Sequence, residues 1–383
     1  MYGLLLALIY LAFISLGLPD SLLGAGWPVM YGEFGVPISH MGLISMIISG
    51  GTIVSSLLSD QITRKCGTRF VTAGSVFLTV VALFGFSYAT DFWVLILFAV
   101  PYGLGAGAID AALNQYVALH YKAKHMSWLH CFWGLGAIIS PFVMGYALTH
   151  LQWNNGYRIV GCIQLVILII LLLTLPVWKV NRGQMGEEQK SVGLMGALKI
   201  KGVPYLLTGF FAYCAFEATA MYWASTYFVR VKDIPEGRAA NFASLFYIGI
   251  TVGRFFCGFI TDRLGDRRMI NLGTGVLSVG IMLLLFIGSP NAALVAFVMI
   301  GFGCAPIYPC IIHATPENFG AENAGAIIGI QMASAYIGST FIPPLFGFLG
   351  NSIGFQIMPV YLFVFVVLMI TMTERTFYTT RNK

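Results

Sequence analysis

Long apolar runs, separated by short polar loops, fill most of this 383-residue chain. A helix needs about 20 apolar residues to cross the hydrocarbon of a bilayer. Only 9% of the residues are charged, whereas a soluble domain carries about 25%. Because the charged residues are too few to give the folded chain a polar surface, the sequence predicts an all-α integral membrane protein. Its solvent is the lipid bilayer, and no nucleic-acid partner is expected.

Twelve of the apolar runs predict transmembrane helices. Their approximate ranges are 3–30, 39–59, 70–89, 92–118, 128–149, 157–178, 203–229, 240–260, 270–288, 291–313, 323–349 and 354–373. One long polar stretch, from Trp178 to Lys201, separates six spans from six. We therefore expect a six-helix bundle over 1–178, a linker over 179–201, a second six-helix bundle over 202–373 and a tail over 374–383.

Lysine and arginine are spread unevenly over the loops. If the N-terminus is cytoplasmic, the inner loops and the tail hold sixteen of these residues and the outer loops hold four. Cytoplasmic loops carry the excess of positive charge in membrane proteins. The distribution predicts a multi-pass protein of the inner (plasma) membrane with both termini in the cytoplasm.

The two halves repeat. Each holds an aspartate that follows an apolar span and precedes a basic loop, and "GLGAIISPFVMGY" matches "GSTFIPPLFGF" at the same offset of 202. The matched pairs are Asp60 with Asp262, Gly136 with Gly338, Pro141 with Pro343, and Gly145 with Gly347. A parallel repeat of six helices predicts two pseudo-symmetric bundles that face a central cavity, which is typical of transporters.

"GFITDRLGDRR" (258–268) is the most specific stretch of the sequence. Its glycine allows close packing of helices, its first aspartate ends a helix, and its arginines lie on the predicted cytoplasmic side. Such charges can form ion pairs that exist in one gating state and break in another. The candidate gating residues are Gly258, Asp262, Arg263, Arg267 and Arg268, with Asp60 in a degraded first-half copy. The alternative is an anchor for orientation and nothing more.

Four charged residues lie within the spans: Asp20, Asp110, Glu217 and Arg254. A charge at the centre of a span costs about 2.5–3.5 kcal/mol on insertion scales, so such residues tend to face a cavity or a partner. Asp110 and Asn114 share one helix face because they are four positions apart. Glycines on that face leave room for a ligand or for a closely packed neighbour. A structural carboxylate with a buried partner is the alternative.

The other buried charges have recognisable surroundings. Asp20 follows Pro19 in a glycine-rich stretch, which predicts a broken helix with an acid at the break. Glu217 lies among aromatic residues, and an acid beside aromatic faces suits a sugar ring with its apolar face and hydroxyl rim. We expect Arg254 to be a partner of the gating motif more than a substrate ligand. Further polar candidates for the substrate site, each with ordinary helix packing as its alternative, are His130, Tyr222, Trp223 and Gln331.

Taken together, these residues resemble the major facilitator superfamily, whose loop signature Gly-x-x-x-Asp-Arg-x-Gly-x-Arg-Arg is matched by 258–268. Within it the chain is most similar to the fucose–proton symporters and the bacterial glucose/mannose–proton symporters. "LPDSLL" resembles the fucose family's Asn-Asp-Ile-Leu-Leu, and "GAIDAALN" resembles its Gly-x-x-Glu-Thr-Ala-Ala-Asn. The resemblance implies that Asp20 takes the family's aspartate, Asp110 its proton-coupling glutamate and Asn114 its asparagine.

The resemblance extends to two more candidates. His130 falls where the fucose family has a cavity glutamine, and Glu217 in "YCAFEA" matches a glutamate of the glucose/mannose symporters. Asp110 is one carbon shorter than the family's glutamate, and Gly17 replaces a polar cavity residue. These departures bear on which sugar is bound.

The expected function is secondary active transport: proton-coupled symport of a hexose-like sugar by alternating access, in a monomer. No cofactor and no metal site are expected; the proton is the coupling ion, with sodium left open. Part of "GLGAIISPFVMG" resembles the signature of drug–proton antiporters, so antiport is the alternative. The chain holds no His-x-x-x-His, no nucleotide-binding loop and no soluble sensory domain, which disfavours an enzyme or a receptor.

Overall fold

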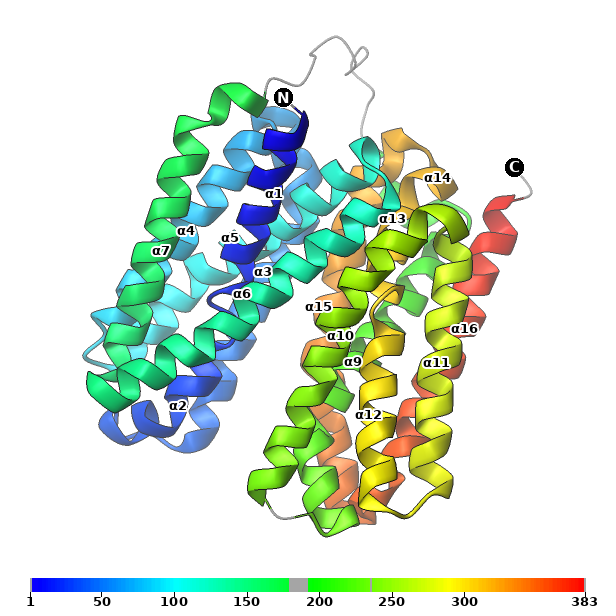
Figure 1. The fold of residues 1–383 in the computed structure, drawn as a ribbon. Coiled ribbons are helices and arrows are strands. Elements are labelled where there is room, and N and C mark those ends of the chain that lie inside the picture. Colours follow the sequence, from blue (N-terminus) through cyan, green and yellow to red (C-terminus); the bar gives the residue numbers. More distant parts are fainter. Residues whose placement is uncertain (1, 179–191, 235, 382–383) are drawn as a thin grey trace. The chain divides into compact units, whose positions relative to one another are not determined.

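A computed structural model describes residues 2–178, 192–234 and 236–381, and helices dominate these residues (Figure 1). The first half holds α1 (Tyr2–Gly17), α2 (Leu22–Glu33), α3 (Met41–Cys66), α4 (Thr68–Ser87), α5 (Phe92–His120), α6 (Ala123–His150) and α7 (Trp153–Leu173). The second holds α8 (Gly193–Lys199), α9 (Val203–Lys232), α10 (Glu236–Leu264), α11 (Asp266–Phe286), α12 (Pro290–Cys304), α13 (Ile307–His313), α14 (Thr315–Phe319), α15 (Ala321–Ile353) and α16 (Met358–Arg381). Short 3₁₀ turns lie at Ile38–His40, Leu175–Trp178 and Phe355–Ile357.

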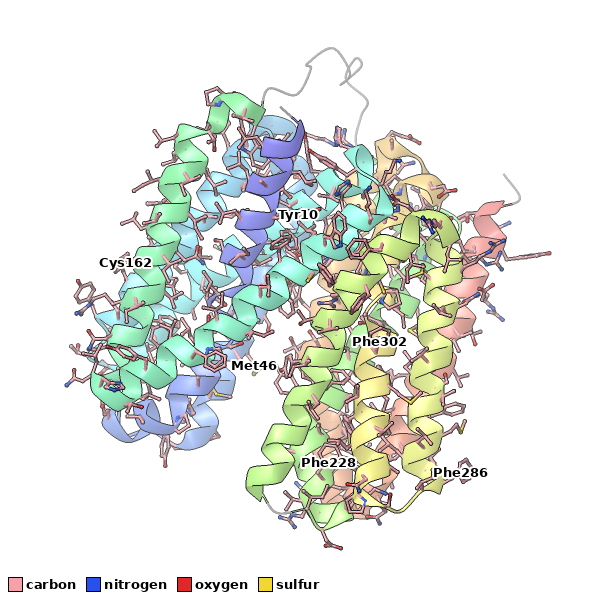
Figure 2. The ribbon with its side chains drawn as sticks, viewed as in Figure 1. Tyr10, Met46, Cys162, Phe228, Phe286 and Phe302 are labelled. Carbon is pink, nitrogen blue, oxygen red and sulfur yellow. The ribbon has the colours of Figure 1, made fainter. Side chains whose placement is uncertain are left out.

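Eleven helical segments of the described chain are long and apolar enough to cross a membrane. The remaining long helix, α9, has 30 residues and carries Glu217 and several tyrosines, which lower its mean hydropathy. With α9 the structure has the twelve long helical segments that the sequence predicts. Large apolar side chains project outward from them, as Figure 2 shows for Phe286, which is 81% exposed. Exposed apolar surface of this kind is suited to lipid.

The first span is interrupted, as the sequence predicts. Helix α1 ends at Gly17, four residues without regular helix follow, and α2 begins at Leu22. Proline at position 19 cannot donate a backbone hydrogen bond, which favours a break at this point. A Cβ atom on Gly17 would collide with the backbone carbonyl of Trp133 in α6. The interruption and the close crossing of α1 and α6 therefore both depend on local sequence.

The chain forms two compact units. Unit 1 comprises Met1–Tyr116 and Phe132–Val192, and unit 2 comprises Val117–Cys131 and Gly193–Lys383. In unit 1, α4 packs along α7; in unit 2, α9 packs against α15 and α16, and α12 against α10 and α11. Residues 179–191 of the expected linker lie outside the described residues. The stretch expected as a tail continues α16 as far as Arg381.

Glycines mark equivalent helix crossings in the two units. In unit 1, a Cβ atom on Gly103 of α5 would meet the carbonyl oxygen of Ile48 in α3. In unit 2, a Cβ atom on Gly301 of α12 would meet the carbonyl oxygen of Phe246 in α10. Gly301 lies 198 positions after Gly103, and Phe246 lies 198 positions after Ile48, whereas the sequence repeat has an offset of 202. The difference of four residues is about one helical turn.

Candidate functional site

Asp20 lies in the interruption between α1 and α2, and its carboxylate is exposed. The hydroxyl of Tyr102 in α5 donates to Asp20 Oδ1 at 2.8 Å, and the indole N–H of Trp133 in α6 donates to Asp20 Oδ2 at 2.9 Å. Both oxygens are therefore engaged by aromatic side chains from two different helices. Each carboxylate oxygen has a second lone pair, so the group can still accept hydrogen bonds from a ligand.

Tyr102 and Trp133 were absent from the predicted site. Both are amphipathic aromatic residues within predicted spans, and their polar atoms need a hydrogen-bond partner when buried in lipid or protein. The need of each side chain for a partner could therefore be predicted from the sequence. The partner could not, because the two donors lie 82 and 113 positions away from Asp20 in the chain.

Asp110 is buried in α5 and is joined to Asn114, as their spacing predicts. Asn114 Nδ2 donates to Asp110 Oδ1 at 2.8 Å and to the backbone oxygen of Asp110 at 2.9 Å. The glycines of this face pack against a neighbouring helix: a Cβ atom on Gly107 would meet the carbonyl oxygen of Thr52 in α3. Of the two predicted purposes of the glycine face, the structure has the closely packed neighbour.

Helix α3 adds a row of hydroxyl groups along this crossing. Ser55, Ser56 and Ser59 donate to backbone oxygens of α5 at 3.4, 3.2 and 3.3 Å. Carbonyls in a helix can accept a second hydrogen bond, because each oxygen has two lone pairs. The serines thus hold α3 to the turn of α5 that carries Asp110. They were not predicted, since small hydroxyl residues in a span have no pattern that distinguishes packing from function.

A second polar cluster lies in unit 2. Arg254 Nη2 of α10 lies 3.4 Å from Glu217 Oε1 of α9, with side-chain exposures of 4% and 19%. Tyr213, one turn before Glu217, donates its hydroxyl hydrogen to the backbone oxygen of Cys304 at 3.0 Å. The sequence favoured the gating motif as the partner of Arg254, and the structure pairs it with Glu217.

His130 and Tyr308 lie beside this pair. His130 is buried, and its ring centre lies 4.8 Å from that of Tyr308 at an interplanar angle of 73°. Tyr308 also lies 4.7 Å from Phe210 and directs its hydroxyl to Met332 Sδ at 3.4 Å. The histidine therefore joins the aromatic part of the unit 2 cluster.

Three other predicted ligands lie in different surroundings. Trp223 donates to the backbone oxygen of Pro343 at 2.8 Å and packs between Phe346 and Phe355, so its contacts are those of a packed side chain. Tyr222 is 64% exposed. Gln331 is buried and accepts a hydrogen bond from Thr315 at 3.1 Å, while its Nε2 has no hydrogen-bond partner among the described residues.

The motif at 258–268 connects α10 and α11 to the start of α6. Asp262 Oδ1 accepts the backbone N–H of Lys124 at 3.1 Å, and Asp262 Oδ2 lies 3.7 Å from Lys124 Nζ. The first N–H groups of a helix have no acceptor within the helix. Asp262 supplies an acceptor for one of these groups in α6. A Cβ atom on Gly258 would overlap the indole ring of Trp128, whose N–H donates to the oxygen of Phe255 at 3.2 Å.

Two of the other predicted gating charges, Arg267 and Asp60, each have an ion-pair partner. Arg267 forms an ion pair with Glu374 of α16, while Arg263 and Arg268 are exposed. In unit 1, Asp60 is bonded within its own helix by Arg64, whose Nε lies 3.0 Å from Asp60 Oδ2. Asp262 thus reaches another helix, and Asp60 is bonded by a side chain one turn away on its own helix. A search of the described residues for groups of three or more potential metal ligands finds none.

Comparison with known protein families identifies the family of this chain. The profile of the Major Facilitator Superfamily matches residues 9–242 and 233–382, which together span nearly the whole chain. The chain belongs to this superfamily. Its fold is therefore the major facilitator fold of twelve transmembrane helices in two pseudo-symmetric bundles.

Individual relatives and solved structures agree with the assignment. An uncharacterised superfamily transporter of Yersinia pestis is 23% identical, covering 89% of this chain and 88% of the relative. The glucose/mannose transporter GlcP of Bacillus subtilis is 21% identical, covering 88% of this chain and 86% of the relative.

Two solved structures have the same fold. The fucose:proton symporter FucP of E. coli, in the outward conformation, matches with a TM-score of 0.80 at 17% identity, covering 97% of this chain and 98% of FucP. The proton:xylose symporter XylE matches with a TM-score of 0.80 at 12% identity, covering 97% of this chain and 94% of XylE. These two likenesses concern the fold; membership of the superfamily is what makes the chain a multi-pass membrane transporter of small molecules and not an enzyme, as the sequence predicts.

Proposed function

We propose that this superfamily member is a proton-coupled symporter of a monosaccharide that works by alternating access. The observation that carries the proposal is the exposed carboxylate of Asp20, held by Tyr102 and Trp133 at the interruption of the first span. A carboxylate accepts hydrogen bonds from sugar hydroxyls, and aromatic rings suit the apolar face of a sugar. The structural likeness to FucP and XylE and the relationship to GlcP support a sugar as the substrate.

In this proposal Asp110 carries the proton. Burial in a low dielectric favours the uncharged form of a carboxyl group, so Asp110 can hold a proton in one facing state and release it in the other. The amide of Asn114 donates to Asp110 Oδ1, an atom that can accept in both the ionised and the protonated acid. The local geometry is therefore kept while the charge changes.

The proton gradient supplies enough free energy for uphill transport. One elementary charge that crosses 100 mV contributes about 2.3 kcal/mol. Since about 1.4 kcal/mol corresponds to a factor of ten, one proton per sugar supports roughly fifty-fold accumulation. No bound cofactor and no ATP are needed. Sodium coupling predicts instead that uptake follows a sodium gradient and survives a protonophore.

The test compares two transport modes in the same proteoliposomes. Asp110→Asn mimics the protonated acid, so we expect it to abolish proton-driven uphill uptake while downhill counterflow continues. Asp20→Asn removes the charged acceptor and is expected to weaken sugar binding as well. If Asp110→Asn still concentrates sugar against its gradient, the proton is carried elsewhere and Glu217 is the next residue to test.

The proposal places the Lys/Arg-rich ends of the helices in the cytoplasm of a cell whose plasma membrane holds the carrier as a monomer. Drug–proton antiport makes different predictions, namely resistance of cells to cationic drugs and no sugar-induced proton uptake. Within the stretch that resembles the antiporter signature, a Cβ atom on Gly136 would meet the backbone oxygen of Ile14, and Ser140 donates to the backbone oxygen of Leu18. These contacts pack α6 on α1 and give the stretch a structural purpose.

A further inference from the structure

His313 lies where three segments of unit 2 meet. It is the last residue of α13, and its ring reaches two acceptors. Its Nδ1 lies 2.7 Å from Oδ2 of Asp266, the first residue of α11, and its Nε2 lies 3.2 Å from the backbone oxygen of Tyr121, between α5 and α6. We call these three residues the His313 site. Proton-coupled transport through Asp110 makes no use of it.

Both contacts of the ring require one additional proton. A backbone oxygen can only accept, so Nε2 must carry a hydrogen. A neutral imidazole then has a lone pair on Nδ1, and an ionised carboxylate has only lone pairs to offer. At 2.7 Å these two acceptors need a hydrogen between them. The hydrogen is present if His313 is an imidazolium or if Asp266 is a neutral acid, so the geometry requires the proton whichever atom holds it.

The surroundings of the two side chains favour a proton that can be exchanged. The side chain of Asp266 is 8% exposed, and its Oδ1 has no hydrogen-bond partner among the described residues, although the weak thiol donor of Cys310 faces this carboxyl group. The side chain of His313 is 20% exposed, so water can reach it. Loss of the proton sets a carboxylate against a lone pair, and a neutral ring can donate to only one of its two acceptors. One contact then breaks.

Tyr121 belongs to a stretch that the gating motif also holds. Residues 117–131, which end α5 and begin α6, group with unit 2, whereas the rest of both helices groups with unit 1. Asp262 binds this stretch at Lys124. Alternating access moves one bundle against the other, so contacts that hold 117–131 within unit 2 have to be released in one facing state. The His313 site therefore binds its proton more tightly when the stretch is docked than when it is released.

We propose that the His313 site is a regulatory proton-binding site, distinct from the coupling proton on Asp110, which docks the end of α5 when it is protonated and releases it when it is not. Linkage fixes the direction, because the state that binds one more proton is favoured as the pH falls. In the proposed topology the site lies beside the cytoplasmic basic loops. The consequence for transport rests on the proposed function: a carrier that brings protons into the cell slows as the cytoplasm acidifies.

The other titratable and charged groups around the site come from the start of α6 and the residue before it, from α10, from α13 and from α14. Histidine is the side chain whose charge ordinarily changes between pH 5 and pH 8, so His125 is the group to control for. Its ring lies 5.5 Å from that of Tyr121. The remaining groups are Glu317 and Cys310 near His313 and Asp266, Cys257 near Cys310, and Lys122, Lys124 and Asp262 near His125.

The test is amide hydrogen exchange of the purified full-length carrier from pH 6 to pH 9, with each rate divided by the intrinsic rate of that amide at the same pH. The reporters are the amides of Tyr121, Lys124 and His125, each of which is hydrogen-bonded. In the wild type we expect opening of this stretch to increase by up to tenfold for each unit of pH once the proton leaves the His313 site. Amides of α4, in unit 1, are the internal control and should show no such change.

Asp266→Asn is the decisive variant. The asparagine amide can donate to Nδ1 of a neutral His313 while Nε2–H donates to Tyr121, so both contacts form without the added proton. We therefore expect the stretch to stay protected at every pH in this variant. His313→Asn can neither titrate nor reach both acceptors, so opening should be frequent and independent of pH. His125→Asn is the matched control, which removes the neighbouring histidine and should keep the pH dependence of the wild type.

Transport is measured in proteoliposomes that carry Asp110→Asn, in which counterflow involves no coupling proton. With glucose, mannose and fucose as probes, counterflow should slow as the pH falls, and adding His313→Asn should remove this dependence. Counterflow that does not change with pH, beside exchange that does, would overturn the regulatory role. If none of these sugars shows counterflow, the proposed function fails, and the exchange measurements still decide whether the His313 site binds its proton.

Three exchange results would overturn the inference itself. The first is a wild-type carrier in which opening of the stretch does not change with pH. The second is a folded His313→Asn or Asp266→Asn carrier that keeps the pH dependence of the wild type. The third is loss of that dependence in His125→Asn, which would assign the titration to the neighbouring ring.

Discussion

Replacing Asp262 by asparagine should loosen the start of α6 without removing the substrate site. Asp262 makes two contacts with Lys124, a hydrogen bond of 3.1 Å from the backbone N–H and an ion pair of 3.7 Å with the ammonium group. Asn keeps an oxygen that can accept the N–H. The charge-assisted bond, worth about 1.5–3 kcal/mol, then becomes a neutral one worth about 0.5–1.5 kcal/mol. The ion pair is partly exposed on both sides and adds only about 0.2–1 kcal/mol.

The total loss is therefore about 1–2 kcal/mol, which corresponds to a factor of about 5–30 in the population of the docked α6 end. Hydrogen exchange of the backbone amide of Lys124 reports this population directly, and it should become faster by that factor in Asp262→Asn. Lys124→Ala is the matched control. It removes the ammonium group and keeps the amide, so exchange should rise by no more than about fivefold.

Transport should slow in Asp262→Asn, while substrate affinity should stay within a few-fold of the wild type. The reason is that the affected contacts join helix ends and do not include Asp20, Asp110 or Glu217. Unchanged amide exchange would show that Asp262 does not hold α6. A folded Asp262→Asn protein that no longer binds substrate would refute the assignment of this motif to conformational exchange.

Two further predictions concern packing in unit 1. Gly136→Ala should destabilise the carrier by about 1–3 kcal/mol, which is the usual cost of overpacking, because the new methyl group would meet the backbone oxygen of Ile14. Gly145→Ala in the same helix is the matched control. The space at Gly145 is open, so the temperature of thermal unfolding should stay unchanged. Equal unfolding temperatures for the two variants would contradict this. Gln164→Leu should cost about 1–3 kcal/mol, because Gln164 both accepts from the hydroxyl of Ser15 and donates to its backbone oxygen; a variant as stable as the wild type in a thermal-unfolding assay would exclude that role.

The helices could be predicted from the sequence because the bilayer imposes one simple rule. Each span must be apolar over about 20 residues, and that property is local in the chain. The interruption at Asp20 and the bond between Asp110 and Asn114 are also local, since they depend on a nearby proline and on a spacing of four residues. All three features could therefore be predicted from the sequence.

The partners of the buried charges are not local. Arg254 pairs with Glu217, 37 positions earlier and on another helix, and no spacing rule says which faces of two helices meet. The same limit explains Tyr102 and Trp133 at Asp20. It also explains Trp223, for which the sequence left a sugar site and ordinary packing both open, and whose ring packs among phenylalanines of α15 and the turn before α16. Charge identifies a residue that needs a partner, and only the packing of helices identifies the partner.

The rigid support of Asp20 has a consequence for the thermodynamics of binding. Tyr102 and Trp133 each have only two side-chain torsions, and their hydrogen bonds fix the carboxylate before any ligand arrives. Ordering a flexible side chain on binding costs about 0.5–1.5 kcal/mol, and here that ordering has already occurred during folding. A ligand of Asp20 therefore meets a preorganised acceptor, so its binding entropy should reflect displaced water and the ligand's own torsions more than any loss of motion in the protein.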